Sequence, residues 1–473
     1  MRVIFAFFVN TLCNFAIGLL VAKFLGPEEF GRFALAMSIG VVLQTGLFDW
    51  IRLASVRFYS ERSRREQPEL RATLDLTFAA IAFLVGAMAI FAVTMRWTFS
   101  LSSALVGLAA ALSIANGLFD YQTALVRARF QDQLYGRLIL SKNLLALAVT
   151  AGGAWWFGSS EVALIGVCIS MMGSIFLARH ALHDEAARRP LAQRALAFSC
   201  LRYAAPIVAA NILYQLIPLA NRALVARWEG FSETGQYSLS FDLGTRVIAA
   251  IGTALDVLLF QIAVRADETH GAKEGREQVA RNMGLVFAVL APTCAGIWLT
   301  LPSIERLVVP FEYRGPFEHY FSLLIGAFFA FGMINFAVNP VFQISRRTAP
   351  MIAAASLACI ADGALILALP RTGANLAIAQ SGAMLAGLAA LIVFAGASGA
   401  RWPRLRDIVI SCIAVAAMVA ALLPMRNREP GIATLVLQVA AGVGIYGAFV
   451  AALDIAGLRA VASDFVRSLR ARA

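Results

Sequence analysis

The chain has 473 residues, of which 60% are hydrophobic and only 14% are charged, and its formal net charge is +12. A soluble domain carries about 25% charged residues and at most about half apolar ones. This composition excludes a soluble globular protein and indicates that lipid is the solvent for most of the chain. The excess of arginine and lysine is typical of the cytoplasmic loops of membrane proteins, so we expect no nucleic-acid partner.

Fourteen apolar segments, each bounded by charged residues or by glycine and proline, predict transmembrane helices. In chain order they are 3–22, 33–51, 74–95, 101–126, 138–157, 161–178, 203–226, 236–264, 283–301, 319–343, 351–369, 375–396, 408–424 and 431–454. The first segment has the pattern of a signal peptide, with Arg2 before a long apolar run. We interpret it as a spanning helix, because it is long enough to cross a membrane and because a later segment repeats it.

The loops that follow the even-numbered segments are rich in arginine, and the opposite loops hold far fewer basic residues. Basic residues collect on the cytoplasmic side of a membrane protein. We therefore expect a multi-pass membrane protein with both termini in the cytoplasm. The tail, 455–473, fits two interpretations equally, an amphipathic helix on the inner membrane surface or a solvated end.

Parts of the chain repeat at a shift of 204 residues. Residues 20–26 (LVAKFLG) match residues 224–230 (LVARWEG), and further on Gly31 aligns with Gly235. A second match, at a shift of 219 residues, relates the fourth segment to the tenth. Six helices therefore repeat as six helices, and an even-numbered repeat keeps its orientation in the membrane.

The repeat predicts an all-α integral membrane fold of about fourteen transmembrane helices. Two six-helix bundles, 1–195 and 196–396, are related by a pseudo-twofold axis along the membrane normal. The remaining stretch, 397–473, holds two extra C-terminal helices and the basic tail. No segment between the spans is long enough to form a separate domain.

The cysteines and histidines show no pattern of a metal site. None of the six cysteines belongs to a CxxC pair, and five of them lie inside apolar segments. Three of the four histidines lie in predicted loops, and His319 is the first residue of the tenth segment. The chain also lacks a nucleotide-binding loop and a GxSxG nucleophile motif. We interpret the cysteines as packing residues and expect no metal, no cofactor and no catalytic residues.

A polar stripe follows one face of the seventh segment, where Asn211, Gln215 and Arg222 lie at helical spacing. The repeat places Thr11 and Asn14 at related positions of the first segment. We interpret both stripes as the lining of a substrate cavity, with Arg222 as a contact for phosphate or an acidic sugar. The alternative is hydrogen bonding between helices, which is common in membrane bundles.

Other charged residues inside the predicted segments have several possible roles. Arg246 follows Asp242 by one helical turn, so the two form an ion pair, contact substrate or bind a coupling proton or cation. Asp49 and Arg52, at the inner end of the second segment, form a gate or anchor a loop. With Asp242, Asp49 and Asp120 are also candidates for a coupling site or an ion pair. Asp120 lies near the cytoplasmic end of the fourth segment, and a structural cap or ion pair is favoured there over a site.

The stretch 21–36 (VAKFLGPEEFGRFALA) resembles the opening signature of bacterial polysaccharide (O-antigen-type) flippases. These proteins belong to the multidrug/oligosaccharidyl-lipid/polysaccharide exporter superfamily. The stretches 221–224 (NRAL) and 235–239 (GQYSL) are similar to the segment that opens the second half in that family. The resemblance covers the whole chain in topology and these stretches in residue detail.

The resemblance implies two six-helix bundles that face each other across a central cavity. The substrate would be an undecaprenyl-pyrophosphate-linked oligosaccharide, moved from the inner to the outer leaflet of the bacterial cytoplasmic (inner) membrane by alternating access. Coupling to a proton or sodium gradient is an expectation that rests on Asp242 and not on the resemblance. Expected partners are membrane lipid, the lipid-linked glycan, a polysaccharide polymerase and glycosyltransferases. The alternatives are export of another lipid-linked precursor or a drug, and, less favoured, a membrane polymerase or ligase.

Overall fold

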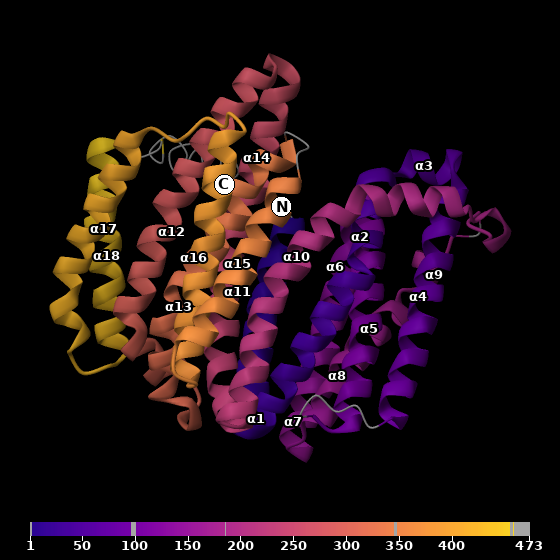
Figure 1. Ribbon diagram of the computed structural model, residues 1–473, viewed down its shortest axis with the longest axis horizontal. Coiled ribbons are helices and arrows are strands. Elements are labelled where there is room, and N and C mark those ends of the chain that lie inside the picture. The colour runs from indigo at the N-terminus through magenta and orange to yellow at the C-terminus, as the bar shows by residue number, and fades with distance from the viewer. Residues whose placement is uncertain (1, 96–100, 185, 345–347, 455–456, 458–473) are drawn as a thin grey trace. The chain divides into compact units, whose positions relative to one another are not determined.

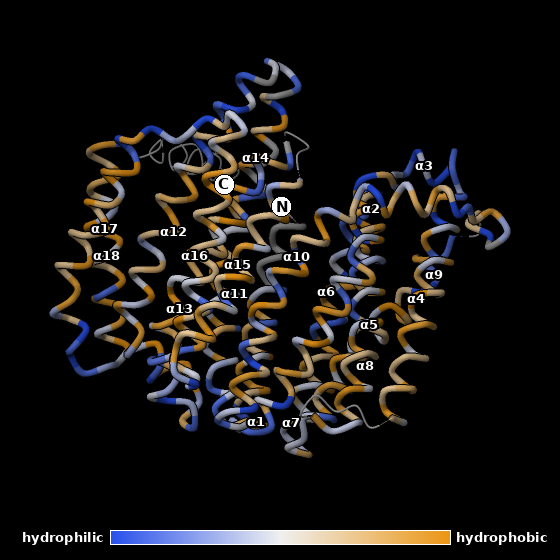
Figure 2. Tube along the Cα trace, in the orientation of Figure 1, coloured by the Kyte–Doolittle hydropathy of each residue, from blue (hydrophilic) through white to orange (hydrophobic). Residues whose placement is uncertain are grey.

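The computed structural model describes residues 2–95, 101–184, 186–344, 348–454 and 457. Within these ranges every regular element is a helix (Figure 1). Apolar residues run along the long helices and hydrophilic residues gather toward their ends (Figure 2). Among the described residues, 12 helices are long and apolar enough to cross a membrane. The prediction of an all-α, multi-pass membrane fold is confirmed.

Contacts divide the chain into two compact units. The first comprises Met1–Leu239 and Arg371–Leu376, and the second comprises Ser240–Pro370 and Ala377–Ala473. The boundary that the repeat places at residue 196 therefore falls inside the first unit. The division of the sequence into two repeats at that residue stays a prediction.

The first unit contains the N-terminal half of the chain and the first residues of α16 (Gly373–Ala397). Its helices are α1 (Arg2–Leu47), α2 (Asp49–Phe58), α3 (Glu61–Glu66), α4 (Pro68–Thr94), α5 (Ser103–Ala128), α6 (Asp132–Leu145), the π-helix η1 (Ala146–Ala151), α7 (Gly152–Phe157), α8 (Ser160–Leu177), α9 (Arg179–Leu182), η2 (Arg189–Leu191) and α10 (Arg194–Trp228). Helix α10 packs against α1 and α2. This packing explains why α10 belongs to the first unit although it opens the second repeat.

The second unit contains the C-terminal helices. They are α11 (Phe231–His270, which begins in the first unit), α12 (Ala272–Val308), η3 (Phe311–Tyr313), α13 (Pro316–Met333), η4 (Ile334–Val338), α14 (Asn339–Ile344), α15 (Ala349–Ala368), α16 (Gly373–Ala397), α17 (Leu405–Arg426) and α18 (Ile432–Leu453). Helix α12 packs against both α17 and α18. The tail predicted to be amphipathic lies outside the described residues, except for Gly457.

Helix α1 contains the first predicted segment and most of the second, whose last residues lie in α2. Its part from Asn10 to Leu47 has 38 residues, which at about 1.5 Å per residue is nearly twice the roughly 30 Å hydrocarbon core. Gly26, with φ 70° and ψ 172°, separates α1 into two helical halves. Glycine adopts this φ without the steric cost that a side chain brings. The other predicted segments also fall on helices, the eighth of them on α11.

The two copies of the repeat meet at a close crossing of α1 and α11 inside the first unit. A Cβ at Gly31 would lie 2.0 Å from the carbonyl oxygen of Phe231, and a Cβ at Gly235 would lie 2.0 Å from that of Pro27. A shift of 204 residues converts Pro27 into Phe231 and Gly31 into Gly235, so the contact is reciprocal. Reciprocal contacts of this kind are the mark of a twofold relation. Equivalent residues of the two sequence repeats are therefore in contact in the structure.

Glutamates beside this crossing hold the starts of two other helices. The Glu29 carboxylate accepts hydrogen bonds from the backbone N–H of Ser160 at 3.0 Å and from its hydroxyl at 2.7 Å, at the start of α8. The Glu229 carboxylate accepts from the backbone N–H of Gly373 at 2.9 Å, at the start of α16. Each carboxylate satisfies an N–H that the helix itself leaves open and interacts favourably with the helix dipole. The sixth and twelfth predicted helices are thus held in the same way.

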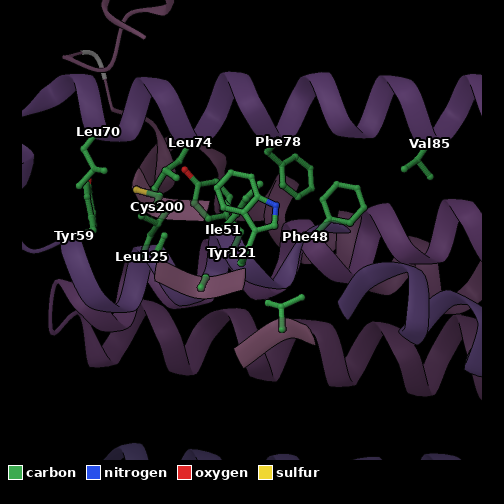
Figure 3. Packing of buried hydrophobic residues seen from close by; sticks show 14 of the residues in the cluster. Phe48, Ile51, Tyr59, Leu70, Leu74, Phe78, Val85, Tyr121, Leu125 and Cys200 are labelled. Carbon is green, nitrogen blue, oxygen red and sulfur yellow. The ribbon is translucent and has the colours of Figure 1, made fainter. Parts of the chain in front are cut away.

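Aromatic and aliphatic side chains of α2, α4, α5 and α10 form a buried cluster in the first unit (Figure 3). The ring centroid of Phe78 lies 4.8 Å from that of Phe48 and 6.0 Å from that of Tyr121. Cys200 is buried in the same cluster, in the packing role expected of the cysteines. Because lipid chains are as apolar as these side chains, close packing and dispersion rather than exclusion of water hold the helices together.

Replacing Gly235 tests the crossing. The alanine Cβ of Gly235→Ala would collide with backbone, so α1 and α11 must separate, at a cost of about 1–3 kcal/mol or more. We expect a lower temperature of thermal unfolding in detergent. Gly86→Ala on α4 is the control, because nothing lies within 4 Å of its Cβ position and alanine favours a helix. Equal unfolding temperatures for the two variants would contradict the crossing.

Candidate functional site

A lysine and three asparagines form one hydrogen-bonded cluster inside the first unit. Lys142 donates from Nζ to Asn14 Oδ1 at 3.2 Å and to Asn10 Oδ1 at 3.5 Å. Asn10 Oδ1 also accepts from the amide nitrogens of Asn14 and Asn143, each at 3.1 Å. We call these four residues the amide–lysine cluster. It joins the first half of α1 to α6.

The amide–lysine cluster lies within membrane-spanning helices. Lys142 is ten residues into the candidate span Asp132–Phe157, about 15 Å from its start. A charge at that depth costs about 3 kcal/mol on insertion scales and therefore faces protein or water. The amide oxygens offset part of this cost, and the ring of Phe119, 5.9 Å from Nζ, adds a cation–π contact. The π-helix η1 begins four residues later, and π-helical turns are frequent at functional sites.

Lys142 and Asn143 were not among the site residues expected from the sequence. The signal was present, because Lys142 stands inside the apolar segment 138–157 and is followed directly by an amide. What the sequence did not reveal is that α6 brings these two side chains to Asn14 of α1. Thr11, the other polar residue expected on the first segment, is half-buried on the same helix.

Two expected acidic residues occupy a second polar region of the first unit. Asp49 is buried and forms an ion pair with Arg52, whose Nη2 lies 3.0 Å from its Oδ2. Asp120, on α5, accepts a hydrogen bond from Gln44 at 3.3 Å. Its carboxylate also interacts electrostatically with Asp49, Arg52 and Lys142. Polar side chains of α1, α2, α5 and α6 thus interact with one another, and the gate, anchor and coupling roles stay predictions.

Arg129, which follows α5, forms an ion pair with the carboxylate of Glu61. Arg129 Nε donates to Glu61 at 3.0 Å and ties the short helix α3 to the end of α5. This guanidinium holds the pKa of the Glu61 carboxyl below its usual range. Arg64, also on α3, pairs with Asp184 at 2.9 Å. These ion pairs fasten the α2–α4 connection to the rest of the first unit.

Arg222, the expected substrate contact of the seventh segment, lies buried against α1. It donates to the hydroxyl of Ser38 and, at 3.4 Å, to the carbonyl oxygen of Ala34. Its exposed fraction is 5%. These contacts favour the alternative interpretation, in which the arginine holds two helices together.

The remaining expected residues divide between the two units. Asn211 is half-buried and Gln215 is exposed on α10 in the first unit. Asp242 and Arg246 are both half-buried on α11 in the second unit. Their roles as cavity lining, ion pair or coupling site stay predictions.

The sequence from residue 20 to residue 309 matches the family model described as "Polysaccharide biosynthesis protein". The match covers more than half of the chain. The chain belongs to this family. The resemblance inferred from residues 21–36 is thereby confirmed. No curated protein matches the sequence.

Solved structures share the fold of this family member at low sequence identity. The structure titled "Lipid II flippase MurJ, inward closed conformation" has a TM-score of 0.67 and 13% identity and covers 98% of both chains. An inward-facing multidrug resistance MATE transporter has a TM-score of 0.53 and 12% identity, covering 86% of this chain and 95% of its own. A point mutant of the Vibrio cholerae MATE transporter VcmN has a TM-score of 0.52 and 14% identity over 85% and 96%. The fold is that of these transporters.

Replacing Arg222 tests whether it holds α10 on α1. Arg222→Ala leaves Ser38 and Ala34 without the guanidinium and creates a cavity, so we expect a loss of about 2–4 kcal/mol in stability. The measurement is thermal unfolding of purified protein in detergent, with Arg227→Ala, an exposed arginine on the same helix, as control. A substrate contact alone would leave the unfolding temperature of Arg222→Ala equal to that of the control, which would contradict the holding role.

Proposed function

We propose that this family member is a flippase for an undecaprenyl-pyrophosphate-linked oligosaccharide. It moves this lipid from the inner to the outer leaflet of the cytoplasmic membrane by alternating access, for synthesis of a surface polysaccharide such as O-antigen, capsule or exopolysaccharide. The observation that carries the proposal is the extent of the fold similarity, which covers 98% of this chain and 98% of the lipid II flippase. That extent includes the region of α17 and α18.

Drug export is the competing proposal. The multidrug transporter structure covers 86% of this chain, whereas the lipid II flippase covers 98%. More of the chain therefore lacks a counterpart in the multidrug transporter than in the flippase. The family description names polysaccharide biosynthesis, which fits a glycan substrate better than a drug. Both observations favour a lipid-linked glycan.

The amide–lysine cluster has the chemistry that such a substrate needs inside a membrane. A pyrophosphate is anionic, and an ammonium on a flexible stem is a common phosphate ligand. Sugar hydroxyls donate and accept hydrogen bonds, and each asparagine amide offers two donors and an acceptor oxygen. We assign Lys142 to the pyrophosphate, Asn10 and Asn14 to orienting its ammonium, and all three asparagines to the first sugar.

Lys142 variants test the proposal in cells that depend on this chain for surface polysaccharide. Lys142→Met removes the charge but keeps the length of the side chain, so we expect surface polysaccharide to fall at least about tenfold, the effect of losing one charged contact. Lys142→Arg keeps the charge and should retain part of the activity. The lipid-linked oligosaccharide should accumulate in the methionine variant, because its synthesis continues while its transfer stops.

The control is Lys23→Met, which removes an exposed lysine from α1. Membrane levels of each variant are measured by immunoblot, so that loss of protein is separated from loss of transfer. Normal surface polysaccharide in Lys142→Met cells would contradict the role of Lys142. Loss of polysaccharide without accumulation of the lipid-linked oligosaccharide would contradict the flippase proposal.

A further inference from the structure

A cavity of about 810 Å³ opens in the second unit between α12, α17 and α18. This volume lies within the range of sites that bind small molecules or headgroups. Four arginines line it: Arg281 from α12, Arg401 and Arg404 from the link before α17, and Arg406 from the first turn of α17. We call this cavity the arginine pocket. Most of its lining follows residue 396, outside the predicted six-helix repeats, and α12 of the second repeat supplies the rest.

The charges of the arginine pocket are only partly neutralised from within. Three carboxylates also line it, so its formal net charge is +1. Arg401 pairs with Glu277 at 2.8 Å, and Arg406 donates to the carbonyl oxygen of Leu453, at the end of α18, at 3.5 Å. Arg404 is exposed and precedes the N-terminus of α17, whose dipole adds positive potential. Arg281 pairs at 3.8 Å with Glu274, which lies outside the lining. Arg404 and Arg406 are therefore the arginines of the lining that we assign to the single negative charge of a phosphodiester.

The surroundings of the pocket are those of a membrane interface. Trp402, which lines the pocket, is 43% exposed, and tryptophan is enriched where lipid headgroups meet the hydrocarbon. Directly after it, Leu405, Val409 and Ile413 lie four residues apart on α17, and all three are exposed. Residues at this spacing share one helix face. An apolar strip therefore runs from the mouth of the pocket along the helix.

We propose that the arginine pocket binds the phosphodiester headgroup of an anionic phospholipid. The acyl chains of that lipid lie along the strip formed by Leu405, Val409 and Ile413, and Arg404 and Arg406 contact the phosphate. Basic pockets between transmembrane helices at the cytoplasmic surface are a known form of lipid recognition, and the arginine bias predicts that this end of α17 is cytoplasmic. The site is independent of the glycan flippase proposal, because it uses none of the residues assigned there.

Lipid binding is measured by native mass spectrometry of the full chain, purified in detergent and titrated with phosphatidylglycerol. The variant is Arg404→Gln with Arg406→Gln, and the matched control is Arg188→Gln with Arg194→Gln, two exposed arginines outside the pocket. Each arginine near a lipid phosphate raises the affinity about fivefold. The pocket variant should therefore bind phosphatidylglycerol at least about tenfold more weakly than the wild type. The control variant should bind as the wild type does.

Further titrations identify the ligand. Phosphatidylcholine, which has no net charge, should bind about tenfold more weakly than phosphatidylglycerol, and inorganic phosphate at millimolar concentration should not displace the lipid. Arg404→Gln alone, which leaves the contact of Arg406 with α18 intact, should weaken binding about fivefold if the double variant does not fold. Equal binding of phosphatidylglycerol by the pocket and control variants would overturn the proposal. Displacement by inorganic phosphate would assign the pocket to a soluble anion instead.

Discussion

The reciprocal crossing of α1 and α11 at Gly31 and Gly235 is the contact on which the first unit depends. Each glycine lets the backbone of the other repeat approach closer than any side chain allows. Gly26, at the kink of α1, and Gly230, between α10 and α11, precede the crossing in the two repeats. They also lie 204 residues apart, and both have positive φ. Near these glycines, Glu29 accepts a hydrogen bond from the start of α8, and Glu229 accepts one from the start of α16.

Polar side chains of the first unit lie on both halves of α1, the helix that forms this crossing with α11. The first half of α1 presents Asn10 and Asn14 to α6, and its second half presents Gln44 to Asp120 on α5. A charged group inside a membrane is tolerated only where other polar groups or water meet it. The lysine and the carboxylates therefore mark places where polar side chains of neighbouring membrane helices meet.

Much of the fold could be predicted from the sequence because its signals are local. Apolar runs bounded by charge gave the positions of the helices, and the repeat predicted that Gly31 and Gly235 are equivalent. The amide–lysine cluster could not be predicted in the same way, since the distance between Asn14 and Lys142 depends on how α1 and α6 pack. The direction of Arg222 is also a tertiary property. Helical spacing placed it on a polar stripe, but its guanidinium reaches Ser38 and Ala34 of α1.

The most direct test of the account is transfer by the purified chain in liposomes. Undecaprenyl-pyrophosphate-linked oligosaccharide is placed in both leaflets, and a glycosidase outside the vesicles removes the sugars that it can reach. In liposomes that contain the chain, the sugars of the inner leaflet should become accessible within minutes. The enzyme then removes sugars from more than half of the lipid-linked oligosaccharide. Digestion that stops at one half, as in liposomes without protein, would contradict the claim that the chain moves this lipid.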